Sequence, residues 1–236
     1  MIDIESITNQ IINADCMDIL KELPDKCIDL VLTDPPYGGG GDNWLKAKRS
    51  RFGGWFDKYE IKATRTGGTW STKYQKGNLT AEQDIRHWDV APDEEVFNEI
   101  FRVSKNQIIW GGNYFNLPPT RCFNIWRKLT ISEGFSMAMA EYAWTSFNDN
   151  AKLWELAPQD KNRFHPTQKP VKLIEKQIEL YSNENDLILD CFSGSGTTAV
   201  ACHNLKRRFI CIEKDYDYWK ASVERLENAK AQLKLF

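Results

Sequence analysis

Short apolar runs separated by polar segments recur along the chain, and three of them end beside a carboxylate. Residues 28–33, 187–191 and 208–212 are almost continuously apolar. Runs of this length without alternation are typical of parallel strands that are buried on both faces. Two further runs, at 9–14 and 107–110, predict additional strands of the same sheet.

Helical spacing of apolar residues is found between these strands. In residues 92–104 the apolar side chains recur three and four positions apart, and Pro92 suits the first turn of a helix. Pro24 ends a shorter helix that is predicted earlier in the chain. The other predicted helices are 17–23, 171–181 and 216–235.

The alternation of strands and helices predicts an α/β fold. Segments 122–126 and 141–147, joined by a loop through Gly134, are expected to form an antiparallel hairpin at the edge of the sheet. The expected architecture is a doubly wound, mostly parallel sheet of seven strands with this antiparallel edge hairpin. A chain of 236 residues can form it as a single domain over 1–236.

Composition excludes several classes of protein. The six cysteines are scattered, with no Cys-x-x-Cys pair and no Cys/His cluster at zinc spacing, so we expect no metal. No apolar run approaches the length that spans a membrane, and the N-terminus carries no signal peptide. We therefore expect a cytoplasmic protein with reduced thiols. The net charge of −2 favours no particular partner.

Residues 42–78 differ from the rest of the chain. They carry nine basic and three acidic residues, a net charge of +6, with seven aromatic residues among them. Basic side chains contact phosphates, and aromatic side chains stack on bases or insert between them. We interpret the segment as a DNA-contacting insertion, with a solvated charged loop as the alternative. The DNA-binding candidates are Lys46, Lys48, Arg49, Arg51, Trp55, Arg65, Lys73 and Lys76.

The run 28–33 leads directly into Asp34-Pro35-Pro36-Tyr37 and a series of glycines. Proline stops a strand and stiffens the backbone. The motif should therefore hold Asp34 and Tyr37 at the carboxyl end of a central strand, where open α/β sheets bind their ligands. A carboxylate and the Pro35 carbonyl can accept hydrogen bonds from a planar amino group, and an aromatic face can stack on it. The alternative is a strand that ends in a proline-rich loop.

A glycine-containing turn, Phe192-Ser193-Gly194-Ser195-Gly196-Thr197-Thr198, joins the run 187–191 to a helix. Glu213 ends the next strand, 19 residues after Gly194. Glycines let the backbone approach a ligand closely, and an acid at this offset reaches ribose hydroxyls. A phosphate-binding loop is disfavoured because its lysine is missing. A nicotinamide site is favoured only weakly because Ala199 stands at the third glycine position.

A third segment, His165-Pro166-Thr167-Gln168-Lys169-Pro170, precedes the predicted helix 171–181. The order of the three motifs resembles that of the S-adenosylmethionine-dependent DNA amino-methyltransferases. It is similar to their circularly permuted group, in which a catalytic half, here 1–147, precedes a cofactor half, here 165–236. The resemblance covers 9–37 and 88–236 and implies a Rossmann-like methyltransferase sheet.

The resemblance implies S-adenosylmethionine as the cofactor, and it implies a set of site residues. The catalytic residues would be Asp34, Pro35, Pro36 and Tyr37. The cofactor would be bound by Asp15, Cys16, Asp34, His165, Pro166, Thr167, Lys169, Asp190, Phe192, Ser193, Gly194, Ser195, Gly196, Thr197 and Glu213. Lys169 and a helix N-terminus at Pro170, with Thr167 as a cap or pre-cap residue, suit a methionine carboxylate.

Asp15 follows the run 9–14, and we expect it beside Asp34 at the same edge of a parallel sheet. In the family, an acid here receives the exocyclic amine of the cofactor's adenine. A helix N-cap is an equal alternative from the sequence alone, and one Asp can serve both purposes.

The resemblance implies site-specific methyl transfer to the exocyclic amine of a flipped base in double-stranded DNA. Adenine N6 is expected because the catalytic motif begins with Asp rather than Ser. The alternatives are cytosine N4, a catalytically silent protein that binds DNA or the cofactor, and, more weakly, RNA or protein methylation. A second copy of the chain and a cognate restriction enzyme are open as partners. Since only 148–164 separate the hairpin from His165, target readout is expected in 42–78.

Overall fold

The computed structural model describes residues 2–38, 90–131, 138–158, 164–165 and 167–232. The chain forms two compact units, Met1–Pro35 with Asp93–Phe236, and Pro36–Pro92. The helices and strands of the described residues belong to the first unit. In chain order they are α1 (Ile4–Ile7), β1 (Gln10–Asn13), α2 (Cys16–Leu20), β2 (Ile28–Thr33), α5 (Glu94–Val103), β3 (Ser104–Trp110), the 3₁₀ helix η1 (Gly112–Tyr114), β4 (Phe123–Lys128), β5 (Ala140–Thr145), β6 (Lys152–Leu156), α6 (Val171–Tyr181), β7 (Leu187–Asp190), α7 (Thr197–Asn204), β8 (Arg208–Glu213) and α8 (Tyr216–Ala231).

The described strands form one eight-stranded sheet in the order β1-β8-β7-β2-β3-β5-β4-β6. The first five strands in this order are mutually parallel. β5 is antiparallel to both of its neighbours, and β6 is parallel to β4. Because β5 runs against β3 and β4, its first residues lie at the same edge of the sheet as their last ones.

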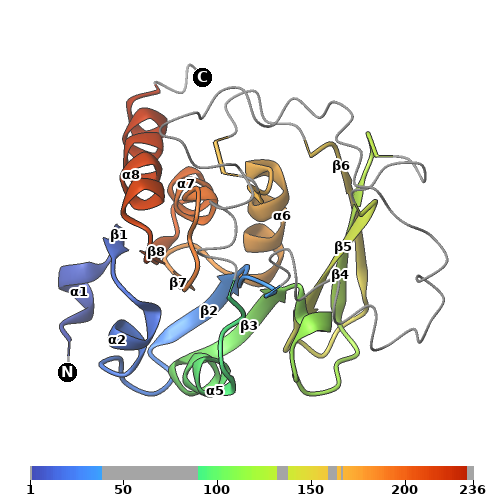
Figure 1. Cartoon of the computed structure of the whole chain (residues 1–236), viewed down its shortest axis with the longest axis horizontal. Helices are drawn as coiled ribbons and strands as arrows, with labels where there is room; N and C mark the ends of the chain where they lie inside the picture. The colour runs from blue at the N-terminus through green and yellow to red at the C-terminus, as the bar shows by residue number, and fades with distance from the viewer. Residues whose placement is uncertain (1, 39–89, 132–137, 159–163, 166, 233–236) are drawn as a thin grey trace, which may run out of the picture. The chain divides into compact units, whose positions relative to one another are not determined.

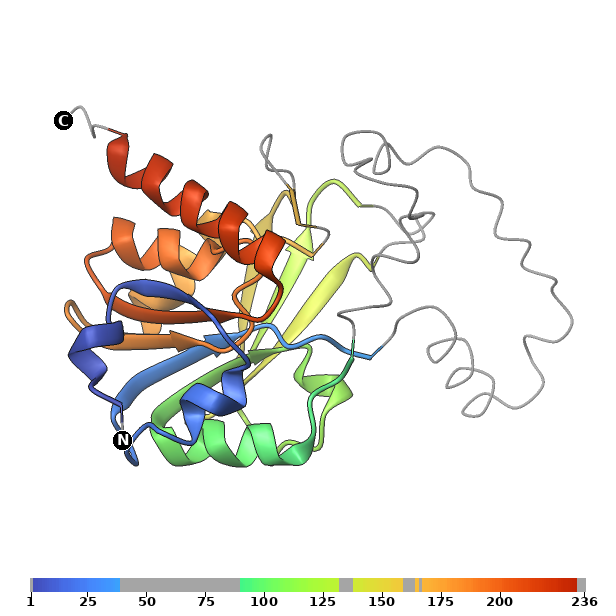
Figure 2. The ribbon, with the colours of Figure 1, turned by 60° about the vertical axis from the view of Figure 1, so that its left-hand side comes forward.

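Helices cover both faces of the sheet (Figure 1). α6, α7 and α8 lie on one face and α2 and α5 on the other, which the turned view in Figure 2 also shows. One core cluster contains Leu173 of α6, Ala201 of α7 and Leu226 of α8. The other contains Leu20 of α2 and Ile100 of α5. The expected α/β fold with helices on both faces is confirmed.

Composition explains the central position of β2 and β7. Leu30 and Val31 of β2 and Ile188 of β7 are at most 1% exposed. Burying an aliphatic side chain of this size contributes about 1.5–3 kcal/mol to folding. Strands that are apolar on both faces gain most when helices cover both, so they occupy the middle of the sheet.

The sheet has eight strands rather than the expected seven. The additional strand, β6, pairs in parallel with β4, and along it exposed residues alternate with partly buried ones. It therefore lacks the continuous apolar run that predicted β2. β6 forms the outer edge, so the β4–β5 hairpin, which was expected at the edge, lies one strand inside it.

The helix expected at 92–104 is shorter than its pattern suggested, because it begins later and ends earlier. Asp93 is the N-cap of α5, so Pro92 precedes the helix instead of occupying its first turn. The helix ends at Val103 because Ser104 already begins β3. β3 is thereby longer at its start than the strand expected at 107–110.

Among the helices of the described residues, none is long and apolar enough to cross a membrane. In the same part of the chain, no group of three or more His, Cys, Asp or Glu is arranged to hold a metal ion. All six cysteines are free thiols. Burial raises the pKa of Cys191 and Cys211, which keeps these thiols neutral and unreactive.

Candidate active site

The carboxyl ends of three adjacent parallel strands bring acidic residues to one edge of the sheet. Asp34 follows β2, Asp190 ends β7 and Glu213 ends β8. Open α/β sheets bind their ligands at this edge. All three residues lie at strand ends, as the sequence predicted, and their roles stay predictions.

Asp34 is bound by the ammonium group of Lys169, which lies just before α6. The side chain of Lys169 is 6% exposed and that of Asp34 is 22% exposed. Lys169 Nζ also lies 3.3 Å from Glu141 Oε2, on β5, and 4.9 Å from the centre of the Trp110 ring, at the end of β3. An ammonium group has three N–H donors, and here they meet two carboxylates and an aromatic face.

Glu141 continues this contact into a chain of four charged side chains. Its Oε1 lies 2.5 Å from Nζ of Lys128, whose side chain is 7% exposed. Burial would raise the pKa of Glu141, but Lys169 and Lys128 lower it. Burial would likewise lower the pKa of Lys169, but Asp34 and Glu141 raise it. The chain therefore sets two ammonium groups against two carboxylates, with alternating sign.

Asp190 is 5% exposed and accepts three hydrogen bonds. Thr33 Oγ1 and the Phe192 N–H donate to its Oδ1 over 2.8 Å and 3.1 Å, and Thr198 Oγ1 donates to its Oδ2 over 2.6 Å. Burial raises the pKa of Asp190 to about 6, although these donors act in the opposite direction. The carboxylate thus ties the end of β2 to the turn after β7 and to the start of α7.

A pH-dependent contribution of Asp190 to stability follows from this burial. Because its pKa of about 6 in the folded protein exceeds the ordinary 3.8, folding takes up a proton between these values, and stability rises as the pH falls through 6. Relative to Asp190→Asn, the free energy of unfolding of the wild type should rise by about 1.4 kcal/mol from pH 8 to pH 5. Urea unfolding of both proteins at each pH measures this. A difference that is constant or falls would contradict the prediction.

Glu213 holds the glycine-containing turn from the neighbouring strand. Its Oε2 accepts the Gly194 N–H over 2.7 Å, and its Oε1 accepts the Asp215 N–H over 2.8 Å. Burial raises the pKa of Glu213, and the two backbone donors partly offset this. Each carboxylate oxygen has a second lone pair, so Glu213 can also accept hydrogen bonds from a ligand.

The two glycines of the turn have backbone conformations that other residues rarely adopt. Gly194 has a φ of +49° and Gly196 a φ of +70°. A Cβ on Gly194 would lie 3.3 Å from His165 Nε2, and one on Gly196 would lie 2.9 Å from Ser222 Cβ. Only glycine therefore fits both positions without strain or displacement.

Arg225 of α8 fixes the same turn from the other side. Its guanidinium donates to Ser195 O and to Thr197 Oγ1, both over 2.9 Å. A rigid backbone turn without side chains at its glycines, with a carboxylate bound to it, fits the nucleoside part of S-adenosylmethionine. The residues present are thus compatible with the cofactor that the motif order implies.

His165 packs beside this turn and is 8% exposed. Its ring centre lies 4.3 Å from that of Tyr218, and its Nδ1 accepts the Thr167 N–H over 3.3 Å. Thr167, expected as a cap or pre-cap residue, does not cap α6, because it turns back onto His165. The N-cap is Pro170, and no side chain caps this helix.

Asp15 is the N-cap of α2, as one of the two interpretations proposed. Its carboxylate accepts the Met17 N–H over 3.0 Å and pairs with Lys214 at 2.8 Å, and both contacts lower its pKa. The expected position beside Asp34 is wrong, because β8 and β7 separate β1 from β2. Asp15 lies instead near the end of β8, since Asn13 is opposite Glu213.

The remaining predicted residues are distributed between the two units and the undescribed part of the chain. Pro35 is buried at the end of the first segment, whereas Pro36 and Tyr37 belong to the second unit and are half-buried. Cys16, Ser193, Ser195 and Thr197 are buried, and Phe192 is half-buried. The residues outside the described part are Pro166 and the DNA-binding candidates Lys46, Lys48, Arg49, Arg51, Trp55, Arg65, Lys73 and Lys76.

Sequence reasoning missed Glu141 and Trp110, which contact Lys169, and Lys128, which contacts Glu141. No local signal marked Glu141, because it starts a segment that was expected as one strand of the edge hairpin, where a charged residue is common. Nothing local indicated its partners, which come from β4 and from the segment before α6.

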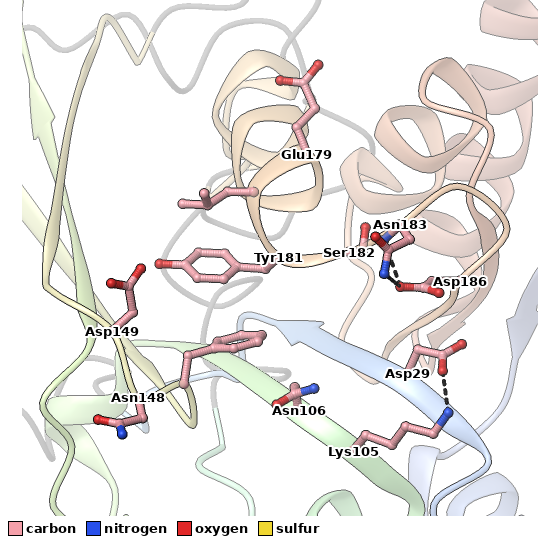
Figure 3. Close-up of a pocket in the computed structure, with 12 residues that line it drawn as sticks. Asp29, Lys105, Asn106, Asn148, Asp149, Glu179, Tyr181, Ser182, Asn183 and Asp186 are labelled. Carbon is pink, nitrogen blue, oxygen red and sulfur yellow. Dashed lines mark hydrogen bonds and ion pairs between the residues drawn. The ribbon is translucent and has the colours of Figure 1, made fainter.

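A separate cleft of about 610 Å³ opens at the opposite edge of the sheet (Figure 3). Asp29, near the start of β2, and Lys105, near the start of β3, line it together with residues at the end of α6. Asp29 serves the fold, since it accepts the Leu187 N–H over 2.8 Å and pairs with Lys105 at 2.6 Å. None of the predicted site residues in the described part of the chain lines this cleft, so it is not the candidate active site.

Solved structures with the same fold include a DNA methyltransferase. The M1.HpyAVI–SAM complex matches with a TM-score of 0.53 and 23% identity, and the match covers 92% of this chain and 99% of that one. The PvuII DNA methyltransferase (cytosine-N4-specific) matches with a TM-score of 0.57 and 16% identity, over 96% of this chain and 87% of that one. The chain therefore has the α/β methyltransferase fold.

The family follows from the sequence comparisons. The model of the N6/N4 methyltransferases, described as DNA methylase, matches residues 55–224, and the chain belongs to this family. Type II methyltransferase M2.MboI of Moraxella bovis is 24% identical over an alignment of 261 residues. The alignment covers 95% of this chain and 89% of that protein. Type II methyltransferase M.HinfI of Haemophilus influenzae is 25% identical over an alignment of 266 residues, which covers 97% of this chain and 71% of that protein. The enzyme is accordingly an S-adenosylmethionine-dependent DNA methyltransferase.

Proposed function

We propose that this enzyme methylates the N6 amine of adenine in double-stranded DNA at a specific target sequence. The observation that supports adenine is Asp34, an Asp rather than a Ser at the start of the catalytic motif, held directly after the central strand β2. A carboxylate only accepts hydrogen bonds and therefore suits an exocyclic amine, which is a donor in both adenine and cytosine. Cytosine N4 is the second candidate, because the N4-specific PvuII enzyme shares the fold.

The proposed mechanism begins with the weak nucleophilicity of an exocyclic amine, whose lone pair is delocalised into the ring. Asp34 accepts one N–H of the amine and the Pro35 carbonyl accepts the other. This draws the nitrogen toward tetrahedral geometry and frees its lone pair. Rigid positioning in a partly buried site then lowers the barrier to attack of the amine nitrogen on the methyl group. Because the amine is enclosed in the duplex, the base must leave the stack, and Tyr37 is proposed to stack on it.

The cofactor supplies an electrophilic methyl group when it is bound. The residues proposed to hold its nucleoside part are Glu213, which accepts hydrogen bonds from the ribose, and the turn 192–197, whose backbone lies close to it. Asp15 and Cys16 are proposed at the adenine, which is supported by their place near the end of β8. Segment 165–169 is proposed at the methionine end. Intact Asp34, Tyr37 and glycine turn argue against a catalytically silent protein.

Domain organisation and biological context are part of the proposal. We infer a single, circularly permuted domain in which the catalytic half, 1–147, precedes the cofactor half, 165–236. A role in restriction–modification is supported by the type II methyltransferases among the relatives. A cognate restriction enzyme and a second copy of the chain are the partners that this role would involve.

Expression in a bacterial host distinguishes the two target bases. Host DNA is digested to nucleosides and analysed by mass spectrometry, with and without the protein. N6-methyladenine that accumulates only on expression supports the proposal. N4-methylcytosine in its place would assign the second candidate.

Residues 42–78 are proposed to contact DNA and to carry much of the target readout, because of their charge of +6. Replacing 44–76 by a Gly/Ser linker should lower DNA affinity and leave cofactor affinity unchanged. The slope of log affinity against log salt should flatten by about one unit for each lost phosphate contact. An unchanged slope with preserved target specificity would show that recognition lies elsewhere.

A further inference from the structure

Asp34, to which the proposed function assigns the target amine, already binds an amine from the protein itself. Lys169 Nζ is its partner, and the Lys169 side chain is only 6% exposed. An ammonium N–H and the N–H of an exocyclic amine are donors of the same kind. A base that enters the site must therefore compete with Lys169 for the carboxylate.

A second acceptor for Lys169 is already in place. Glu141 Oε2 lies 3.3 Å from Lys169 Nζ, and the Trp110 ring centre lies 4.9 Å away. Lys169 can therefore give up Asp34 without leaving an unpaired charge in a buried position, which would be strongly unfavourable. The structure thus offers a low-cost route by which the amine position at Asp34 becomes available.

Lys128 explains why Glu141 keeps one oxygen available for Lys169. Lys128 Nζ occupies the Oε1 side of Glu141 at 2.5 Å, so Oε2 is directed to Lys169. Glu141 lies opposite Trp126, two residues before Lys128 on the paired strand β4. The β4–β5 hairpin thereby fixes the acceptor beside the end of the catalytic strand.

We propose that Lys169 occupies the amine position at Asp34 in the resting enzyme and that Glu141 is the positioning residue that receives Lys169 when the target amine binds. This rests on the proposed function, because it takes Asp34 as the acceptor of that amine. It assigns Glu141, which lies outside all three sequence motifs, a role in accepting the base.

Glu141→Gln tests the proposal because it keeps the size of the side chain and removes its charge. Of its two carboxylate partners Lys169 then keeps only Asp34, because the glutamine oxygen is an uncharged and weaker acceptor, so Lys169 competes more strongly with the target amine. At saturating S-adenosylmethionine, turnover on unmethylated bacterial genomic DNA should fall about tenfold or more. The dissociation constants for cofactor and for DNA, measured by calorimetry and anisotropy, should stay near wild type, because the competition follows DNA binding.

A second substitution separates competition from a merely structural role. Adding Lys169→Met to Glu141→Gln removes the competitor, so turnover should rise above that of Glu141→Gln. Because segment 165–169 is proposed at the methionine end, the dissociation constant of the double variant for S-adenosylmethionine is measured first, and turnover is compared at a concentration that saturates it. Glu141→Asp, which keeps the charge, should retain more turnover than Glu141→Gln. The matched control is Glu155→Gln, which removes the exposed Arg127–Glu155 pair at 2.7 Å in the same part of the sheet and should change nothing.

Two results overturn the inference while leaving the proposed function intact. One is Glu141→Gln with wild-type turnover. The other is a double variant no faster than Glu141→Gln, which would show that the charge chain only supports the fold. A wild-type enzyme that transfers no methyl group to DNA overturns the proposed function and this inference with it.

Discussion

Replacing Asp34 by alanine is expected to abolish methyl transfer, with a fall of about 100-fold or more in kcat. Affinity for S-adenosylmethionine should stay within about tenfold of wild type, because the lost hydrogen bond is made to the target amine and matters most in the transition state. Glu141 lies 3.3 Å from Lys169 Nζ, so the ammonium group still has a charged partner when Asp34 is removed. Labelled methyl transfer and calorimetry measure the two quantities.

Asp29→Asn is the matched control for this variant. Asp29 lies on the same strand, at the opposite end, where it pairs with Lys105 at 2.6 Å. Its replacement should leave turnover unchanged, even if some stability is lost. An Asp34→Ala enzyme that keeps more than about a tenth of wild-type turnover would contradict the assignment of Asp34 as the acceptor of the target amine.

The second large effect is expected on cofactor binding. Glu213→Ala should weaken S-adenosylmethionine affinity by about 10- to 100-fold, because a charge-assisted hydrogen bond to the ribose is lost. Gly194→Val should weaken it further. A valine cannot adopt the φ of +49° without strain, and its Cβ would lie 3.3 Å from His165 Nε2. Calorimetric titration of each variant with S-adenosylmethionine measures both losses.

Glu227→Ala controls for the removal of a carboxylate from the same half of the chain. Glu227 is exposed on α8, where it pairs with Lys230 at 2.8 Å, and its loss should not change cofactor affinity. Unchanged affinity in both Glu213→Ala and Gly194→Val would place the cofactor elsewhere. Tight binding of a nicotinamide dinucleotide or a nucleoside triphosphate by the wild type would favour the rival interpretations of the turn.

Those parts of the fold that depend on local pattern could be predicted from the sequence. The apolar runs of β2, β7 and β8 bury on both faces, and the polar residue that ends each run lies at the expected edge. The alternating pattern of β6 gave no such signal, because its residues are exposed or only partly buried. A short edge strand gains little from hydrophobic burial, so its composition is weakly constrained.

Spatial order was less accessible than the elements themselves. Asp15 and Asp34 both follow strands, but nothing in either segment reveals that β8 and β7 are inserted between β1 and β2. The pairing of Lys169 with Asp34 joins residues 135 positions apart in the chain. Glu141 starts a strand that was expected at the edge of the sheet, where a charge is common, and its two lysine partners come from other elements. The partners of a buried charge depend on which elements are neighbours in the tertiary structure, and local periodicity does not encode that.

The measurement that tests the central claim most directly is the fate of a labelled methyl group. Wild-type enzyme and Asp34→Ala are incubated with methyl-labelled S-adenosylmethionine and unmethylated bacterial DNA, and the DNA is digested to nucleosides. The expected result is label in N6-methyladenine with the wild type and no label in DNA with Asp34→Ala. Label in any other nucleoside, or equal labelling by the two proteins, would contradict transfer to adenine N6 with Asp34 as the acceptor of the target amine.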